Sequence, residues 1–269
     1  MLRHWRIGIK TVSSLDLSLP PINVCYWKSK NVYYSSTELS VEVRTGLKNS
    51  RKAGLLDHLI PAFKTNSDVV ETIIQLISSR NTASDYSDQA LLTIFDLIQG
   101  WGGATGRWPY IVPQGQPHRP FNESFVDSYR KAVHYLFEMQ KNGVNQQLIQ
   151  FANASICELP RVGESFSSKH LLFWSLGLKL TPKLSIFDSR IKLLMAGSSS
   201  CKPSSISYIE FLNTLEESSS ALDVPSEEYE RALFAFSKNY FPNDSLKIKE
   251  EPLLAEDCHI ALALTANSR

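Results

Sequence analysis

The chain of 269 residues lacks long apolar runs, and its longest runs are about five residues, such as Ile260–Leu264. A helix that spans a bilayer needs about 20 consecutive apolar residues, so we expect no transmembrane helix. The first ten residues, MLRHWRIGIK, carry charge but no apolar segment, unlike a signal peptide. These absences predict a cytoplasmic protein that does not act in a membrane.

Cysteine is scarce, and its four positions are far apart, with no CxxC pair and no histidine at ligand spacing: Cys25, Cys157, Cys201 and Cys258. This spacing argues against a zinc finger, an iron–sulfur loop and a disulfide framework. We expect reduced thiols, no metal and no other cofactor.

The chain also lacks an excess of either charge. It has 28 Lys and Arg against 27 Asp and Glu, which gives a net charge of +1. Any surface that binds an anion must therefore be a local patch. Glycine (12) and proline (13) are too few for a collagenous or low-complexity chain. Hydrophobic residues make up 43%, which is enough for a packed core and excludes wholesale disorder.

Helical periodicity is the main feature that is present. Apolar residues at helical spacing predict helices at 68–79, 87–99, 123–141, 144–157, 165–176, 188–196, 207–217 and 226–239. Gly100 is a plausible end for the second of these. Convincing strands are few, so the predicted fold class is mainly α. We expect one unit over 1–269, with an irregular segment 1–38, a helical core 39–240 and a tail 241–269.

The segment 157–196 gathers residues that can carry chemistry. Pro160 and Gly163 interrupt the chain between two predicted helices, and Lys169 lies on the second. Asp188 follows Lys169 by 19 residues and precedes the next predicted helix.

Three short motifs carry a resemblance: LPRVG at 159–163, SKHLLF at 168–173 and FDSR at 187–190. In this order and spacing they resemble the helix-hairpin-helix DNA glycosylase superfamily, particularly its 8-oxoguanine glycosylase-like branch. The SKxLxF and DSR patterns are closer to bacterial relatives, some of which remove glucosylated hydroxymethylcytosine from phage DNA. The resemblance implies a two-lobed helical fold, with the active site between the lobes and the target base flipped out of double-stranded DNA. We expect the protein to be a monomer.

The resemblance also assigns roles to individual residues. It implies Asp188 and Lys169 as the catalytic pair. It places DNA contacts at Arg190, Arg161, Gly163 and Lys192. In the family the lysine usually lies two residues after the second hairpin glycine, whereas Lys169 lies six after it, and Arg161 replaces the first glycine. These departures predict either a remodelled hairpin or a helix that begins earlier relative to the lysine.

The catalytic pair has a chemical rationale. Cleavage of an N-glycosidic bond builds positive charge on the sugar, which a carboxylate such as Asp188 stabilises. A lysine with a lowered pKa attacks C1′ and forms a Schiff base, and the apolar neighbours of Lys169 would lower its pKa. The ordinary alternatives are that Asp188 only caps a helix and that Lys169 is solvated.

A second informative stretch, GWGGATGRWPY at 100–110, has four glycines between two tryptophans. Glycines allow close backbone approach, and aromatic rings stack on a flipped base. This interpretation assigns the base pocket to Trp101, Gly102, Gly103, Trp108 and Tyr110. The alternative is a helix-capping glycine turn with Trp101 in the core.

Basic residues recur in clusters that would either follow a phosphate backbone or simply face solvent: Arg44, Lys48, Arg51 and Lys52, and then Lys179 and Lys183. Three functions remain open beside the ordinary alternative, an all-α regulatory protein in which the motifs are a coincidence. The first is a DNA glycosylase that removes a modified cytosine in defence against phage. The second is a repair glycosylase and lyase of the 8-oxoguanine type, and the third is a non-catalytic DNA-binding module. A cleft shared by Asp188 and Lys169 would favour an enzyme.

Overall fold

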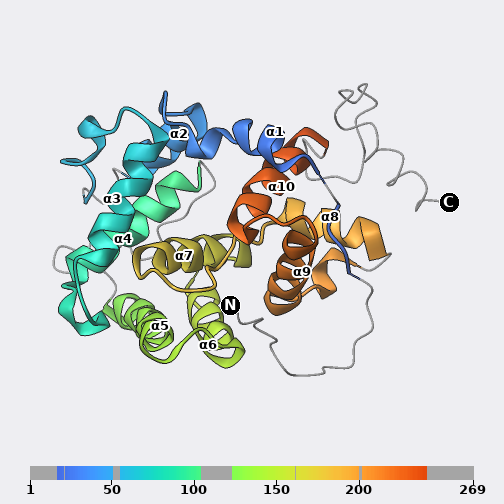
Figure 1. The fold of residues 1–269 in the computed structure, drawn as a ribbon. Coiled ribbons are helices and arrows are strands. Elements are labelled where there is room, and N and C mark those ends of the chain that lie inside the picture. Colours follow the sequence, from blue (N-terminus) through green and yellow to red (C-terminus); the bar gives the residue numbers. More distant parts are fainter. Residues whose placement is uncertain are drawn as a thin grey trace.

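The computed structural model describes residues 17–20, 22–50, 55–103, 123–160, 162–199 and 202–240. Within these ranges it contains ten α-helices and no strand, which confirms the mainly α prediction (Figure 1). The helices are α1 (Val24–Ser29), α2 (Val41–Ser50), α3 (Asn66–Ser78), α4 (Asp88–Trp101), α5 (Glu123–Asn142), α6 (Gln146–Cys157), α7 (Glu164–Gly177), α8 (Ser189–Ser199), α9 (Tyr208–Ala221) and α10 (Ser226–Tyr240). Short 3-10 helices are η1 (Val32–Tyr34), η3 (Ile60–Ala62), η4 (Ala83–Asp85) and η5 (Pro203–Ser205).

Local sequence signals determine where several helices begin. The Thr65 hydroxyl accepts a hydrogen bond from the Asp68 N–H, and the Asp68 carboxylate accepts one from the Thr65 N–H. This reciprocal capping box starts α3, and Ser207 with Glu210 starts α9 in the same way. Ser87 caps α4.

Helix α4 runs further than the sequence predicts. It continues through Gly100 to Trp101, and Gly102 is its C-cap, so the prediction that Gly100 ends the helix is wrong. Gly100 instead lies where α4 crosses α2. A Cβ on Gly46 would lie 2.0 Å from the Gly100 carbonyl oxygen, so glycine at position 46 permits the close approach of the two helices.

Segments from opposite ends of the sequence lie side by side. Helix α1 packs on α10, which also contacts α8 and α9, whereas α2 packs on α4 and α5 packs on α6 (Figure 1). Residues 24–29 belong to the segment expected to be irregular, yet they form α1. Asn23 caps this helix, and the buried ring of Trp27 packs edge-to-face on Phe236 of α10.

No helix in the described part of the chain is long and apolar enough to cross a membrane. Cys25 and Cys157 form no disulfide, and burial raises the pKa of the Cys157 thiol. Cys201, residues 1–16 and the expected tail 241–269 lie outside the described residues.

Candidate active site

A cavity of about 340 Å³ collects residues from distant parts of the chain. Its walls come from residues 31–34, α2, the end of α4, α7, residues 186–190 and α10. The volume lies in the range of ligand sites, about 300–1,000 Å³. Six residues predicted for the site line it: Lys169, Asp188, Arg190, Trp101, Gly102 and Gly103.

Helix α7 carries Lys169 into this cavity. The side chain is only 8% exposed, and its Nζ donates hydrogen bonds to the Ser165 carbonyl at 3.1 Å and the Ser165 hydroxyl at 2.9 Å. Nζ also lies 4.7 Å from the ring centroid of Phe166. Burial lowers the pKa of Lys169, and the charges of Asp188 and Glu230 oppose this shift. Lys169 is therefore desolvated rather than solvated.

Asp188 caps a helix and also lines the cavity. Its Oδ1 accepts the backbone N–H groups of Arg190 and Ile191, each at 3.0 Å, at the start of α8. Its Oδ2 makes no hydrogen bond to any described residue. The capping role and a catalytic role are compatible, because each uses a different oxygen.

Ser168 holds the two predicted motifs together. Its buried hydroxyl accepts a hydrogen bond from the Phe187 N–H at 2.9 Å, and it lies 3.1 Å from the Ser165 carbonyl oxygen, to which it donates. Ser168, which precedes Lys169, is thus hydrogen-bonded to Phe187, which precedes Asp188. This contact fixes the segment that carries Asp188 against α7.

A buried polar network supports the other side of α7. Gln99 Nε2 donates to His170 Nε2 at 3.2 Å, so the neutral ring carries its proton on Nδ1 and donates it to the Tyr129 hydroxyl at 2.9 Å. Trp174 Nε1 donates to the same hydroxyl at 2.9 Å. Burial, reinforced by the charge of Lys169, lowers the pKa of His170 to about 3. The imidazole therefore stays neutral and joins α4, α5 and α7.

Trp101 borders the cavity from the core. It is 2% exposed, its Nε1 donates to the Tyr33 carbonyl at 3.1 Å, and its ring packs edge-to-face on Phe173. Gly102 caps α4, and Gly103 has a φ of 96°. Residues 100–103, the part of the glycine-rich stretch that the structure describes, thus end and cap α4 with Trp101 in the core. This matches the alternative interpretation, a helix-capping glycine turn.

Gly102 also makes room for Lys169. A Cβ at this position would lie 2.5 Å from the Phe166 ring and 3.2 Å from Lys169 Cδ. The absence of a side chain therefore lets α7 place both groups against the end of α4.

Two other predicted residues that the structure describes, Lys192 and Gly163, do not line the cavity. Lys192 forms an ion pair with Glu164, and its Nζ lies 4.8 Å from the ring centroid of Phe187. Gly163 is the N-cap of α7 with a φ of −86° and open space where a Cβ would be, so its backbone does not require glycine. Arg161, Trp108 and Tyr110 lie outside the described residues.

Comparisons with known proteins find no match. No family model, curated protein or solved structure is significantly similar to the chain. Its function must be inferred from the residues of the cavity.

Glu230, a cavity residue on α10 that is 2% exposed, was not predicted from the sequence. Burial raises the pKa of Glu230 to about 8. It was missed because it follows two other glutamates at a helix start, where acidic residues usually face solvent. The helical register was the available signal, since Glu230 lies three residues before the buried Leu233 and seven before the buried Ser237.

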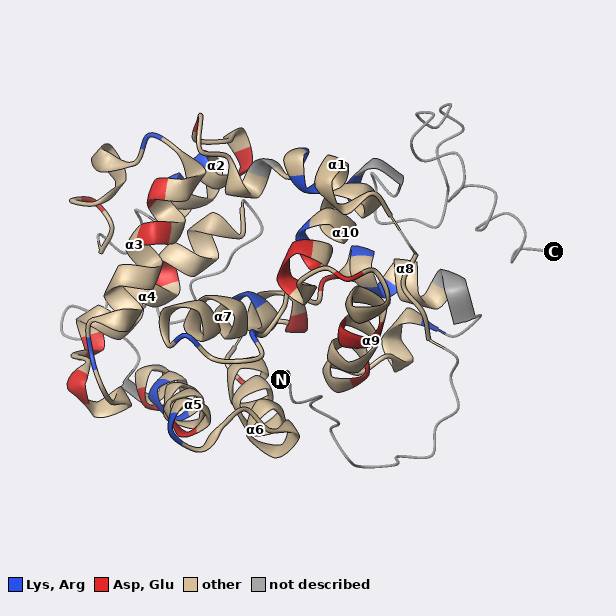
Figure 2. Cartoon of the chain, viewed as in Figure 1, with Lys and Arg blue, Asp and Glu red and all other residues tan. Residues whose placement is uncertain are grey.

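Positive charge at the cavity is local. Basic and acidic residues are spread over several of the described helices, and α9 carries only acidic ones (Figure 2). Beside the cavity, Lys238 pairs with Glu42 at 3.1 Å, and Lys183 pairs with Glu227 at 2.8 Å. Among the described residues, no group of three His, Cys, Asp or Glu could hold a metal ion.

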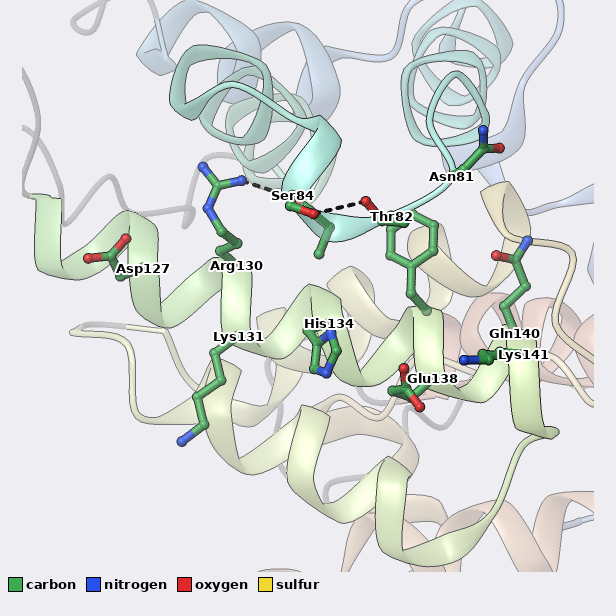
Figure 3. Close-up of a pocket in the computed structure, with 12 residues that line it drawn as sticks. Asn81, Thr82, Ser84, Asp127, Arg130, Lys131, His134, Glu138, Gln140 and Lys141 are labelled. Carbon is green, nitrogen blue, oxygen red and sulfur yellow. Dashed lines mark hydrogen bonds between the residues drawn. The ribbon is translucent and has the colours of Figure 1, made fainter.

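A larger groove of about 880 Å³ lies between η4 and α5 (Figure 3). Arg130 crosses it and donates to the carbonyl oxygens of Ala83 and Tyr86. The ionisable side chains around it are exposed or half-buried, and they include Lys131 and His134. None of the predicted site residues lines this groove, so the smaller cavity is the better candidate despite its size.

Proposed function

We propose that the protein is a DNA N-glycosylase, which flips a modified base out of double-stranded DNA and leaves an abasic site. The observation that carries this proposal is a convergence: Lys169 from α7 and Asp188 from the start of α8 line one cavity with Arg190. This reaction needs a buried amine, a carboxylate with one oxygen free of hydrogen bonds to the described residues, and a cation suited to a phosphate.

We propose a two-lobed arrangement with the cavity between the lobes. Helices α2–α7 form one lobe, and α1 with α8–α10 forms the other. The packing of the helices supports this division, since α10 contacts α1, α8 and α9, whereas α7 contacts α3–α6. The cavity residues come from both groups.

The reaction follows from these groups. As the bond between C1′ and the base breaks, its electron pair leaves with the base, and positive charge develops on the sugar. The carboxylate of Asp188 stabilises this charge. The lone pair of neutral Lys169 then bonds to C1′, and loss of a proton with opening of the sugar ring gives a Schiff base. Burial favours the neutral amine that this step requires.

The proposed target is glucosylated hydroxymethylcytosine, and the proposed role is bacterial defence against phage that carry this base. The support is the resemblance of SKHLLF at 168–173 and DSR at 188–190 to bacterial relatives with that activity. 8-Oxoguanine is the competing target, implied by the broader branch.

The test is base release from two DNA duplexes, one carrying glucosylated hydroxymethylcytosine and the other 8-oxoguanine. Wild type should release one base, and Asp188→Asn should not. Asp127→Asn, an exposed aspartate on α5, is the matched control and should act as wild type. Release that persists in Asp188→Asn would reject the proposed chemistry. Binding of both duplexes without any release would instead favour the non-catalytic module.

A second measurement addresses Lys169. Borohydride should trap wild type on the DNA it processes, and Lys169→Gln should abolish trapping. Lys131→Gln, at an exposed position of α5, should still be trapped. Trapping that survives in Lys169→Gln would show that another amine forms the Schiff base.

A further inference from the structure

Glu230 is a buried carboxyl group without a hydrogen-bond or ion-pair partner in the described part of the chain. It is 2% exposed and lines the same cavity as Asp188 and Lys169. No hydrogen bond or ion pair joins it to another described residue. Two neighbouring glutamates on α10, Glu227 and Glu228, each form an ion pair with a lysine at 2.8 Å. Of the three glutamates at the start of α10, Glu230 is therefore the one that lines the cavity and forms no ion pair with a described residue.

The surroundings of Glu230 favour its protonated form. Burial is the largest influence and raises its pKa to about 8, and the charge of Asp188 acts in the same direction. The charges of Arg231 and Lys169 oppose the shift. The guanidinium of Arg231 lies 4.1 Å from the ring centroid of Tyr34. Two phenols near Glu230 remain neutral, because burial raises the pKa of each far above neutrality: Tyr34 and Tyr208.

The cavity thus holds two carboxyl groups in different environments. Asp188 accepts two backbone N–H groups, whereas Glu230 has no donor and is a neutral acid at pH 7. Two carboxyl groups in such contrasting surroundings are suited to different roles in acid–base chemistry. Phe234, one turn further along α10, adds an aromatic side chain to the cavity lining beside Glu230.

We propose that Glu230 is the general acid that protonates the departing base, an inference that rests on the proposed glycosylase function. The C1′–N bond breaks with its electron pair remaining on the base, and the O–H proton of Glu230 passes to a nitrogen or oxygen of the base. Glu230 is left as a carboxylate. It regains a proton from water after the base has left. Separately, a proton of the ammonium group that Lys169 forms on bonding to C1′ passes to the ring oxygen O4′ as the C1′–O4′ bond breaks and the Schiff base forms.

The first test is the pH dependence of single-turnover base release, measured from pH 6 to 9.5. The wild-type rate should fall as the pH rises through about 8, because Glu230 loses the proton that it donates. Glu230→Gln should lower the rate at pH 7 by about 10²–10⁴-fold, the usual contribution of a general acid, and should remove this fall. Glu217→Gln, an exposed glutamate on α9, should match wild type. A variant Glu230→Gln with the wild-type rate or pH profile would overturn the proposal.

The second test separates proton donation from a structural role. DNA with a preformed abasic site has no base to protonate, so borohydride should trap Glu230→Gln on it as efficiently as wild type. Loss of trapping would mean that Glu230 acts on Lys169 or on folding, which overturns the general-acid role. Absence of base release by wild type from either modified duplex would overturn the glycosylase function itself, an outcome distinct from a failure confined to Glu230.

Discussion

Replacing Asp188 separates its two roles. Its Oδ1 caps α8 through two hydrogen bonds of 3.0 Å, and its Oδ2 makes no hydrogen bond to any described residue at the cavity that Asp188 lines. Asparagine caps a helix as well as aspartate does, so Asp188→Asn should leave the free energy of unfolding nearly unchanged. Asp188→Ala loses the cap and should lower that free energy by about 0.5–2 kcal/mol.

Both variants remove the carboxylate that faces the sugar in the proposed reaction. Loss of one positioned electrostatic group typically slows an enzyme by about 10²–10³-fold, so base release should fall at least that far in Asp188→Asn and Asp188→Ala alike. Denaturant unfolding and single-turnover base release, measured on the same preparations, give the two readouts. Asn145→Ala is the matched control, because it removes the side chain that caps α6 by accepting the Leu148 N–H at 3.0 Å. It should lose similar stability and keep its activity.

Two outcomes would refute this reasoning. If Asp188→Asn released the base at the wild-type rate, Asp188 would be a helix cap and nothing more. If Asp188→Asn were as unstable as Asp188→Ala, the two hydrogen bonds would not be the contacts that hold the start of α8.

Three further predictions concern stability. Gly46→Ala should lower the free energy of unfolding by about 1–3 kcal/mol in urea titration, because its Cβ would meet α4, whereas Gly163→Ala, in open space, should change it by less than about 0.5 kcal/mol. The unfolded chain protonates His170 near pH 6.5, but the folded chain does so only near pH 3, so stability should fall as the pH drops below 6.5 and lose roughly 2 kcal/mol by pH 5. His170→Gln should flatten that dependence, and the exposed His134→Gln should retain it. Ionising the buried Glu230 lowers the free energy of unfolding as the pH rises from about 4.5 to 8. Glu230→Gln should therefore raise that free energy by roughly 3 kcal/mol at pH 7 and by little at pH 4.5. No gain at pH 7 would show that the buried carboxyl has a partner.

The helices could be predicted because their signals are local. The predicted 123–141 and 226–239 match α5 and α10 to within one residue, since apolar spacing and helix-start residues lie within the segments themselves. Helix α1 escaped prediction because it has six residues and too few apolar positions to show a period. Its burial depends on α10, about 200 residues away in the sequence.

The same distinction explains which parts of the site could be predicted. Lys169 and Asp188 were found because one stretch of 40 residues carries both, with its own hairpin and cap. Tyr33 and Glu230 line the cavity only because the two ends of the helical core fold back on each other. Gly100 was misjudged for a similar reason: its role is to contact α2, and a glycine in a close helix crossing has the same local sequence as one that ends a helix.

The choice between an enzyme and a passive DNA-binding module depends on what a phosphate backbone requires. Binding phosphates needs cations that solvent can reach, and it has no use for a buried amine or a buried acid. Burying such groups unpaired lowers stability, and nearby lysines such as Lys183 and Lys238 avoid this by pairing with glutamates at the surface. Among the described residues, Lys169 is held in the cavity by the oxygens of Ser165 and by the Phe166 ring, and none of them forms a hydrogen bond or ion pair with Glu230. Nucleophilic and acid catalysis need a buried amine and a buried acid at one cavity. This arrangement therefore favours the enzyme over the passive module.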